Sequence, residues 1–268
     1  MQGRIVFATG NAGKIKEIRM IMEDTGMEVV SMKDAGIMAD IDENGKTYEE
    51  NALIKARAVA AFTNDIVMAD DSGLEIDYLN EESNPSVVRF RELPLDYRIG
   101  SVHLLYDDKG EIVDVDVTAD KFCRVVDKHF NGDLVRVVHL YYDRLMRMVE
   151  LGGFDIVGHA DKMHYNASAY HPGLLDEPWY DALIQGYFDA IARKGYIVEI
   201  NTKSYLELGT FYPNERYFPV LLEKGIRVQV NSDSHYPERI NNGRLQALMA
   251  LQASGYHTVT EMYNNEWK

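Results

Sequence analysis

The chain has 268 residues, of which 46% are hydrophobic, and a formal net charge of −15. This length and composition are enough for one large α/β core or for two smaller domains. The acidic excess argues against nucleic-acid backbones and anionic membranes as partners, and it is compatible either with divalent-cation binding or with simple solubility.

Cysteine content and hydropathy limit the compartment. Cys123 is the one cysteine, so no internal disulfide can form and a reducing cytoplasm is expected. Met1 leads directly into an apolar run without a basic segment before it, so no signal peptide is expected. No uncharged run approaches the about 18 residues that a membrane-spanning helix needs, so no membrane segment is expected.

The N-terminal part alternates between strand and helix patterns. Short apolar runs predict strands at residues 4–8, 27–31 and 65–69. Apolar residues at helical spacing predict a helix over 15–22, and the capping box that begins at Thr47 predicts a second helix, which ends near residue 62. The predicted order is β-α-β-α-β.

The remainder of the chain keeps this alternation. The patterns predict strands at 98–103, 154–158, 196–200 and 227–230, and helices at 133–151, 177–194, 213–224 and 241–254. Such alternation predicts parallel strands covered by helices.

Polar residues follow the apolar strand runs. They are Glu75, His103, His159, Glu199 with Asn201, and Asp233 with His235. In α/β barrels the reacting groups lie at the carboxyl ends of the strands, and histidines mixed with carboxylates suit Zn²⁺, Mn²⁺ or Fe²⁺. Glu75 could bridge two ions and lower the pKa of a water between them.

The alternative is that these are ordinary strand-end histidines bonded to backbone carbonyls. Recurrence on three strands, with acidic partners, favours the metal site. The other histidines do not share this position and are expected on the surface or in helix packing: His129, His139, His164, His171 and His257.

Five ordered motifs carry a resemblance to a known family. They are Leu-Glu-Ile-Asp-Tyr-Leu at 74–79, Ile-Gly-Ser-Val-His at 99–103, Asp-Ile-Val-Gly-His-Ala-Asp at 155–161, Val-Glu-Ile-Asn-Thr-Lys at 198–203 and Asn-Ser-Asp-Ser-His at 231–235. Residues 74–268 thereby resemble the polymerase-and-histidinol-phosphatase (PHP) superfamily, and within it the histidinol phosphatases. The resemblance implies a distorted (β/α)₇ barrel with up to three metal ions that hydrolyses a phosphate monoester.

The same resemblance assigns roles to individual residues. The matched metal ligands are Glu75, His103, His159, Asp233 and His235, with Asp233 also a catalytic carboxylate, and the substrate-facing residues are Glu199, Asn201 and Lys203. The family also places histidines in an opening His-x-His strand end and before the bridging Glu. This chain has no histidine before His103, so about three imidazoles are missing and the site is expected to be incomplete.

A glycine-containing turn stands at the first predicted helix start, in Thr9-Gly10-Asn11-Ala12-Gly13-Lys14. Free backbone N–H groups at a helix N-terminus favour phosphate, although such turns also serve geometry alone. Together with Glu43, the run Glu49-Glu50-Asn51-Ala52-Leu53-Ile54-Lys55-Ala56 and the run Ala69-Asp70-Asp71-Ser72-Gly73-Leu74, it resembles the first half of the inosine/xanthosine triphosphate pyrophosphatases, the HAM1 family. This second resemblance covers residues 3–79.

The HAM1 resemblance implies that Thr9, Asn11, Lys14 and Lys55 contact a triphosphate. It also implies that Glu43 and Asp70 hold Mg²⁺ and that Asp71 is catalytic, because paired carboxylates suit that hard cation. The family's second half, with its Phe-Gly-x-Asp-Pro and Ser-His-Arg stretches, is absent from this chain.

The two resemblances predict a chimera. Residues 1–79 form a pyrophosphatase-like fragment and residues 80–268 a PHP-like barrel portion, whose match begins at about residue 74. The predicted fold is α/β, a distorted PHP-type (β/α)₇ barrel whose first β-α-β-α units are replaced by the β-α-β-α-β fragment. Alternatively the fragment is a separate lobe, and exposed strand edges of an incomplete barrel would then favour aggregation or a homo-oligomer. The seam itself could be a product of recombination, sequence assembly or design.

Three functions remain open at this level. The first is a metal-dependent phosphomonoesterase with a small phosphorylated substrate. The second is a pyrophosphatase for non-standard purine nucleoside triphosphates. The third is a catalytically silent chimera that binds metal or phosphate, which the missing histidines support.

Overall fold

The computed structural model describes residues 4–9, 12–22, 26–39, 41, 48–69, 74–78, 84, 86–93, 95, 97–234, 237–263 and 266–268. It divides the chain into two compact units. The first contains Met1–Gly73, Ser234–Ile240 and Met262–Lys268, and the second contains Leu74–Asp233 and Asn241–Glu261.

The first unit is built on a small parallel sheet. Its elements are β1 (Arg4–Phe7), α1 (Ala12–Ile21), β2 (Glu28–Ser31), α2 (Tyr48–Ala60) and β3 (Ile66–Met68), with the short helix η4 (Pro237–Arg239) and the hairpin β11 (Met262–Tyr263) and β12 (Glu266–Trp267). The strand order is β2-β1-β3, with β1 parallel to both neighbours.

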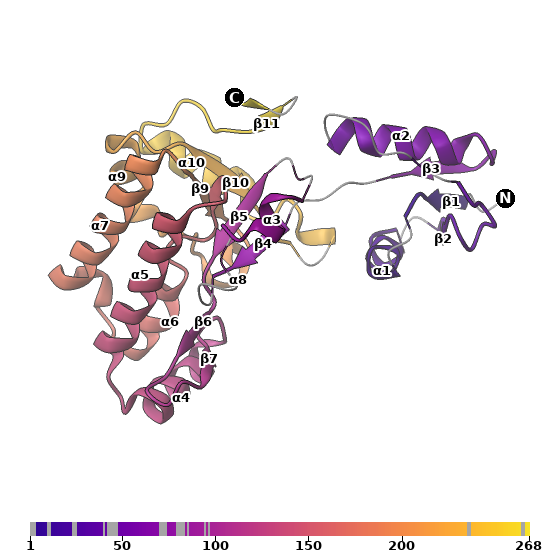
Figure 1. The fold of residues 1–268 in the computed structure, drawn as a ribbon. Helices are drawn as coiled ribbons and strands as arrows, with labels where there is room; N and C mark the ends of the chain where they lie inside the picture. The colour runs from indigo at the N-terminus through magenta and orange to yellow at the C-terminus, as the bar shows by residue number, and fades with distance from the viewer. Residues whose placement is uncertain are drawn as a thin grey trace. The chain divides into compact units, whose positions relative to one another are not determined.

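Alternation along β1 gives this sheet two covered faces. Ile5 and Phe7 pack with Ile15 of α1, whereas Val6 packs with Val59 of α2 on the opposite face. Figure 1 shows the three strands between these two helices. The predicted β-α-β-α-β order is thereby observed, and its strands form a sheet of their own.

The second unit contains the longer parallel sheet. Its elements in chain order are β4 (Leu74–Asp77), α3 (Val88–Arg91), β5 (Arg98–Ser101), β6 (Leu104–Tyr106), β7 (Ile112–Asp114), α4 (Ala119–Phe130), α5 (Leu134–Leu151), β8 (Ile156–Val157), α6 (Met163–Tyr170), η2 (Leu174–Asp176), α7 (Pro178–Lys194), β9 (Ile197–Asn201), α8 (Tyr205–Leu208), η3 (Glu215–Tyr217), α9 (Phe218–Glu223), β10 (Val228–Asn231) and α10 (Arg244–Ala253). The order β10-β9-β8-β5-β4 is parallel throughout.

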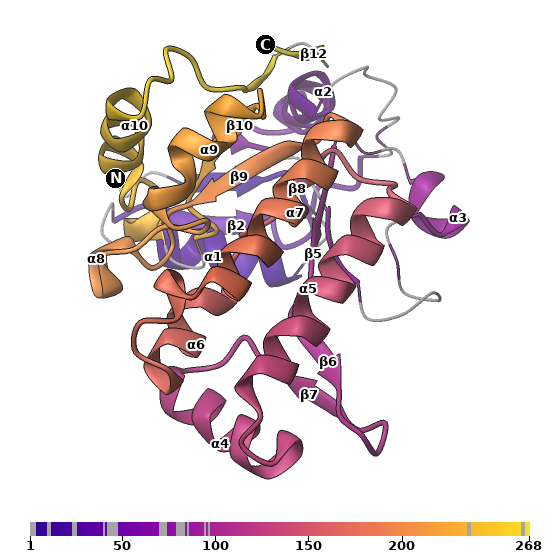
Figure 2. The same cartoon turned by 90° about the vertical axis from the view of Figure 1, so that its left-hand side faces the viewer.

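Helices α5 and α7 lie side by side on one face of this sheet (Figure 2). The N-cap of helix α5 is Asp133, whose side chain accepts a hydrogen bond from the Arg136 amide at 3.0 Å, and the C-cap is Gly152. Gly100 of β5 permits the close approach of α5 and the chain after it, because a Cβ at this position would lie 2.9 Å from the Phe154 ring and 3.2 Å from Met148 Sδ.

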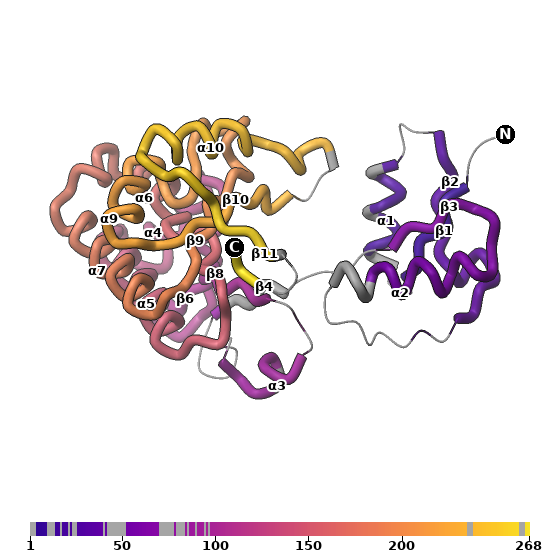
Figure 3. The backbone as a smooth tube through the Cα atoms, turned by 90° about the horizontal axis from the view of Figure 1, so that it is seen from above, coloured from indigo at the N-terminus to yellow at the C-terminus, as the bar shows by residue number. Residues whose placement is uncertain are grey.

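The core of the second unit is rich in tyrosine. The fully buried Tyr142 contacts Tyr141, Tyr180 and Tyr187 edge to face, with ring centroids 5.8–6.0 Å apart. Each large apolar side chain buried in such a core contributes about 1.5–3 kcal/mol. On the C-terminal side, α10 contacts β10, as Figure 3 shows from above.

Several predicted elements differ from the observed ones. The helix predicted over 213–224 begins only at Phe218: η3 comes first, and Pro219, which lacks an N–H, lies in the first turn of α9. The hairpin β6–β7 and the helices α4 and α6 were not predicted. The capping box at Thr47 lies outside the described residues. No described helix is long and apolar enough to cross a membrane.

Candidate functional site

The parallel sheet of the second unit brings four strand ends to one edge. His103 follows β5, His159 follows β8, Glu199 and Asn201 lie in β9, and Asp233 follows β10. Because β5, β8, β9 and β10 are consecutive neighbours and all parallel, their carboxyl ends meet there. Side-chain contacts, together with the backbone amide of His159, link His103 to Lys203 in one series.

The two histidines face each other through their Nε2 atoms. These nitrogens lie 3.0 Å apart, and the rings are tilted by 55° with centroids 4.8 Å apart. Two nitrogens at this spacing can share one proton or ligate the same ion, because ligand atoms with bonds of about 2.1 Å to one ion lie about 3.0–3.4 Å apart. The donor chemistry and spacing therefore fit a divalent ion between His103 and His159.

A carboxylate and an ammonium lie next to this pair. Asp116 Oδ2 is 3.7 Å from His103 Nε2 and 2.5 Å from Lys162 Nζ. Burial raises the pKa of Asp116, but the positive charge and hydrogen bond of Lys162, with His103 and His159, outweigh burial and lower it. Asp116 is therefore an anion at neutral pH, placed beside the histidines.

Glu199 supports the backbone of this edge from inside the protein. It is 4% exposed, and its carboxylate accepts hydrogen bonds from the His159 amide at 2.8 Å and from Asn201 Nδ2 and Asn231 Nδ2, both at 3.2 Å. Burial raises the pKa of Glu199, although the neighbouring His159 and these hydrogen bonds oppose the rise. Glu199 thus positions His159 and Asn201.

Asp233 connects the edge to a lysine. Its Oδ2 accepts from Lys203 Nζ at 3.0 Å and lies 3.4 Å from Asn201 Nδ2, while Asn201 Oδ1 accepts from the Lys203 amide at 3.0 Å. The cationic Lys203 and the Asn201 amide are donors that a phosphate could take over.

Backbone strain coincides with these positions. His159 has φ of 27° and Asp233 has φ of 45°, in the left-handed region that non-glycine residues rarely adopt. Among the described non-glycine residues, the one other positive φ belongs to Asn131, which ends α4. Strain of this kind costs on the order of 1 kcal/mol per residue and concentrates at functional sites.

The remaining predicted site residues are less fully described. The backbone of Glu75 pairs with Ile99 in β5, and its side chain lies outside the described set. Thr9 lies two residues after the end of β1, Lys14 is in α1 and Lys55 is in α2, all in the first unit. Asn11, Glu43, Asp70, Asp71 and His235 lie outside the described residues.

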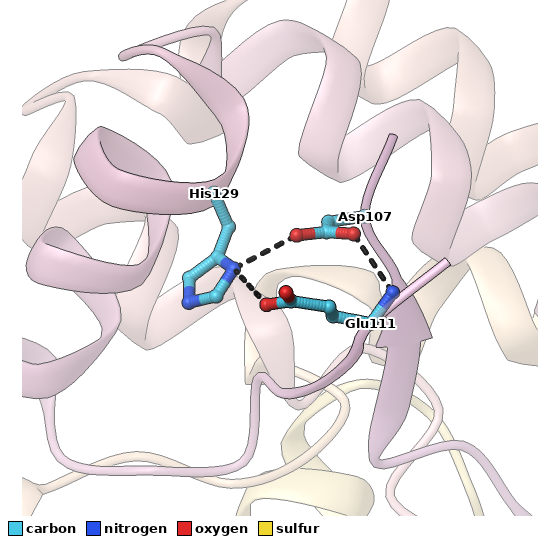
Figure 4. A group of neighbouring side chains, drawn as sticks. All are labelled: Asp107, Glu111 and His129. Carbon is cyan, nitrogen blue, oxygen red and sulfur yellow. Dashed lines mark hydrogen bonds and ion pairs between the residues drawn. The ribbon is translucent and has the colours of Figure 1, made fainter. Parts of the chain in front are cut away.

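A second group in the same unit has donor atoms close enough to hold an ion. In Figure 4, Asp107 and Glu111 of the β6–β7 hairpin point toward His129 near the end of α4. His129 Nδ1 lies 2.9 Å from Asp107 Oδ2 and 3.9 Å from Glu111 Oε2. The other oxygen of Asp107 accepts from the Lys109 and Glu111 amides at 2.9 Å, so this carboxylate also ties the hairpin to α4.

His164, expected on the surface or in helix packing, is buried in a polar network. Its Nδ1 lies 3.2 Å from Asp161 Oδ1 and its Nε2 lies 3.2 Å from Thr210 Oγ1. Burial lowers the pKa of His164, but the adjacent Asp161 carboxylate outweighs this and raises it. Asp161 also accepts from the Asn214 amide, which joins the loop after β8 to the loop after α8.

Sequence reasoning missed Asp116 and Lys162. One signal was available: the alternating pattern on both sides of Asp107-Asp108-Lys109-Gly110 is typical of a hairpin. That hairpin returns the chain beside His103, since the Val115 amide donates to the His103 carbonyl at 3.0 Å.

Comparisons with known proteins find two kinds of relative, one by sequence and one by fold. The model of the Ham1 family matches residues 5–127, so the match continues beyond residue 79. The dITP/XTP pyrophosphatase of Clostridium perfringens is 45% identical over 83 residues, 29% of this chain and 41% of that protein. That of Bacillus subtilis is 50% identical over 74 residues, 28% of this chain and 37% of that protein. That of Desulforamulus reducens is 37% identical over 102 residues, 38% of this chain and 51% of that protein. The chain thus spans about half or less of the length of these curated relatives.

The fold matches a different kind of protein. A Listeria monocytogenes structure described as a histidinol phosphatase matches with a TM-score of 0.61 at 16% identity, covering 91% of this chain and 98% of that one. The chain is chimeric. A Ham1-family segment is joined to a fold of the histidinol-phosphatase type. The histidinol phosphate phosphatase of Lactococcus lactis, solved with zinc, L-histidinol and phosphate, matches with a TM-score of 0.50 at 17% identity over 78% of this chain and 74% of that one.

Proposed function

We propose that the chain is a metal-dependent phosphomonoesterase of the histidinol-phosphatase type, with its site at the carboxyl ends of β5, β8, β9 and β10. The observation that carries the proposal is the 3.0 Å approach of His103 Nε2 to His159 Nε2. The zinc, histidinol and phosphate in the Lactococcus lactis structure support this substrate class.

The proposed ion is Zn²⁺, Mn²⁺ or Fe²⁺, because imidazole and carboxylate donors together suit these metals. His103 and His159 would hold it through Nε2, with Glu75, Asp233 and His235 as further proposed ligands. A bound divalent ion supplies a Lewis acid and lowers the pKa of a water.

The chain's own residues would bind the phosphate and move the proton. Lys203 Nζ would neutralise the phosphate, and the Asn201 amide would donate to one of its oxygens. Asp233 would accept a proton from the attacking water and return it to the leaving alkoxide as the ester P–O bond breaks. Glu199, which contacts the His159 amide and Asn201, would act as a positioning residue.

We propose that the five parallel strands of the second unit form part of a distorted PHP-type barrel. In the chain order, the first β-α-β-α units of that barrel are replaced by the fragment that forms β1–β3.

Phosphate release tests the function. Orthophosphate production from histidinol phosphate is measured with added Zn²⁺ or Mn²⁺ for the wild type, His159→Ala and His139→Ala. His139 stacks on Trp179 with ring centroids 5.8 Å apart and is not at a strand end, so it is the matched control. Activity that disappears in His159→Ala alone supports the proposal, and equal rates in all three proteins refute it.

The Ham1 match favours one second candidate, a nucleoside-triphosphate pyrophosphatase in the first unit. Thr9, Asn11, Lys14 and Lys55 would contact the triphosphate, while Glu43 and Asp70 would hold Mg²⁺ and Asp71 would activate water. Pyrophosphate release from inosine triphosphate, which Lys14→Met should abolish, tests this candidate. A protein that releases neither product from either substrate is the catalytically silent chimera.

A further inference from the structure

We propose that Asp116 is an oxygen ligand of the divalent ion held by His103 and His159. The inference rests on the metal site of the proposed function and adds to it a residue from outside the strand ends. It adds to the two imidazoles, which follow β5 and β8, a carboxylate from a third segment, the chain after β7, beside the further ligands proposed above.

Distance is the first support. Asp116 Oδ2 lies 3.7 Å from His103 Nε2, whereas two ligand atoms on one ion lie about 3.0–3.4 Å apart. A side-chain rotation that moves this oxygen by several tenths of an ångström would close the difference. The backbone of Asp116 is held in position by a hydrogen bond, because its amide donates to Asp114 Oδ1 at 2.8 Å.

Charge is the second support. A divalent ion bound by two neutral imidazoles keeps its full charge, and a carboxylate stabilises it. The Asp116 side chain is 29% exposed, so its carboxylate is partly shielded from water. Two histidines and one carboxylate are also a common ligand set for divalent Fe and Zn.

Lys162 and the ion would compete for the same oxygen of Asp116. Its Nζ is 2.5 Å from the same Asp116 oxygen that faces His103. An ion that binds Asp116 would weaken the ion pair between Asp116 and Lys162. The Lys162 ammonium would then remain at the edge of the site, where it could bind a phosphate. Lys162 is therefore a competitor of the metal, and this assigns opposite effects to its removal and to removal of Asp116.

The experiment is metal titration of the full chain by calorimetry, with Zn²⁺ and Mn²⁺. All proteins carry His129→Gln, so that the group of Asp107, Glu111 and His129 does not contribute. Asp116→Asn should weaken binding by at least about 10-fold, since loss of even an outer partner of a metal ligand costs that much. Lys162→Met should leave the affinity unchanged or raise it, and Asp120→Asn, which removes an exposed carboxylate in the first turn of α4, should leave it unchanged.

The outcomes separate ligation from other roles. If Asp116→Asn and Lys162→Met weaken binding equally, Asp116 acts only through the ion pair, and the proposal is overturned. If the loss in Asp116→Asn vanishes between about 0.05 M and about 0.5 M salt, the effect is long-range attraction, and ligation is again refuted. Unchanged metal binding in Asp116→Asn likewise refutes ligation by Asp116.

The test is independent of turnover. Binding that depends on Asp116 in a protein that releases no phosphate leaves the ligand assignment standing and removes the phosphatase function. Phosphate release by a protein whose metal affinity is indifferent to Asp116 removes the assignment alone.

Discussion

Truncation of Glu199 should loosen the strand-end site and destabilise the second unit. In Glu199→Ala the His159 amide loses its 2.8 Å bond, and the amides of Asn201 and Asn231 each lose one at 3.2 Å. A buried donor left unsatisfied costs about 1–3 kcal/mol. The asparagine amides can turn to other acceptors, so the backbone donor and the small void dominate, and the expected loss of unfolding free energy is about 2–4 kcal/mol.

Glu199→Gln is the matched variant because it keeps the shape. Its carbonyl oxygen can accept from His159 and Asn201, and the Asn231 amide can rotate to accept from the new NH₂ group. The expected change is within about 1 kcal/mol of the wild type at neutral pH.

The pH dependence has a definite sign. Because the pKa of Glu199 is raised above 4.5, its contribution to wild-type stability is complete below that value and is lost as the pH rises through the folded-state pKa. Glu199→Gln does not have this loss, so its stability relative to the wild type should fall as the pH is lowered from neutral toward 4.5.

Urea unfolding followed by Trp179 fluorescence in a Trp267→Phe background reports the second unit, since Trp267 belongs to the first. Equal stability of Glu199→Ala and wild type would refute the role of Glu199 as a structural acceptor. So would a loss in Glu199→Gln as large as in Glu199→Ala.

Three further predictions concern other parts of the second unit. Tyr187→Phe should be neutral or stabilising by about 1 kcal/mol in urea unfolding, because the Tyr187 hydroxyl is buried without a partner among the described residues. Tyr142→Phe should lower the free energy of unfolding by about 1 kcal/mol, because the Tyr142 hydroxyl donates a hydrogen bond to that of Tyr180 at 3.2 Å. His159→Ala should lower Zn²⁺ affinity by at least about 10-fold in calorimetry, with His139→Ala unchanged. His129→Gln should move acid unfolding, followed by circular dichroism, to higher pH. The hydrogen bond from His129 lowers the pKa of Asp107 below 3.8, so Asp107 stabilises the folded state above that value. This stabilisation is lost only as the pH falls through the lowered pKa.

Much of the strand framework was predictable because it depends on local patterns. The apolar run at 4–8, the helix at 133–151 and the strand at 196–200 correspond to β1, α5 and β9 within a few residues. Parallel strands with helical connections necessarily present their carboxyl ends together, so the contact between His103 and His159 followed from their positions after two such strands. The predicted start of the helix at residue 213 was wrong. The periodicity of apolar residues does not show in which turn a proline is best accommodated.

The roles of several residues depend on contacts between distant segments. Asp116 comes beside His103 through a hairpin whose alternating residues were not recognised, and the burial of His164 follows from its approach to Thr210, 46 residues away. Glu75, His235 and the HAM1 carboxylates stay predictions.

Hydrophobic periodicity and chain direction determined by themselves that this protein has parallel strands whose polar residues collect at one end. The motifs determined that a Ham1-like segment and a histidinol-phosphatase-like part are joined in it. Only the tertiary structure decided that β1, β2 and β3 pair with one another in their own sheet, and that the imidazoles of His103 and His159 meet nitrogen to nitrogen beside Asp116 and Lys162. The physical reason is that strand-partner choice and side-chain convergence depend on free energies summed over contacts between remote residues, which no local pattern encodes.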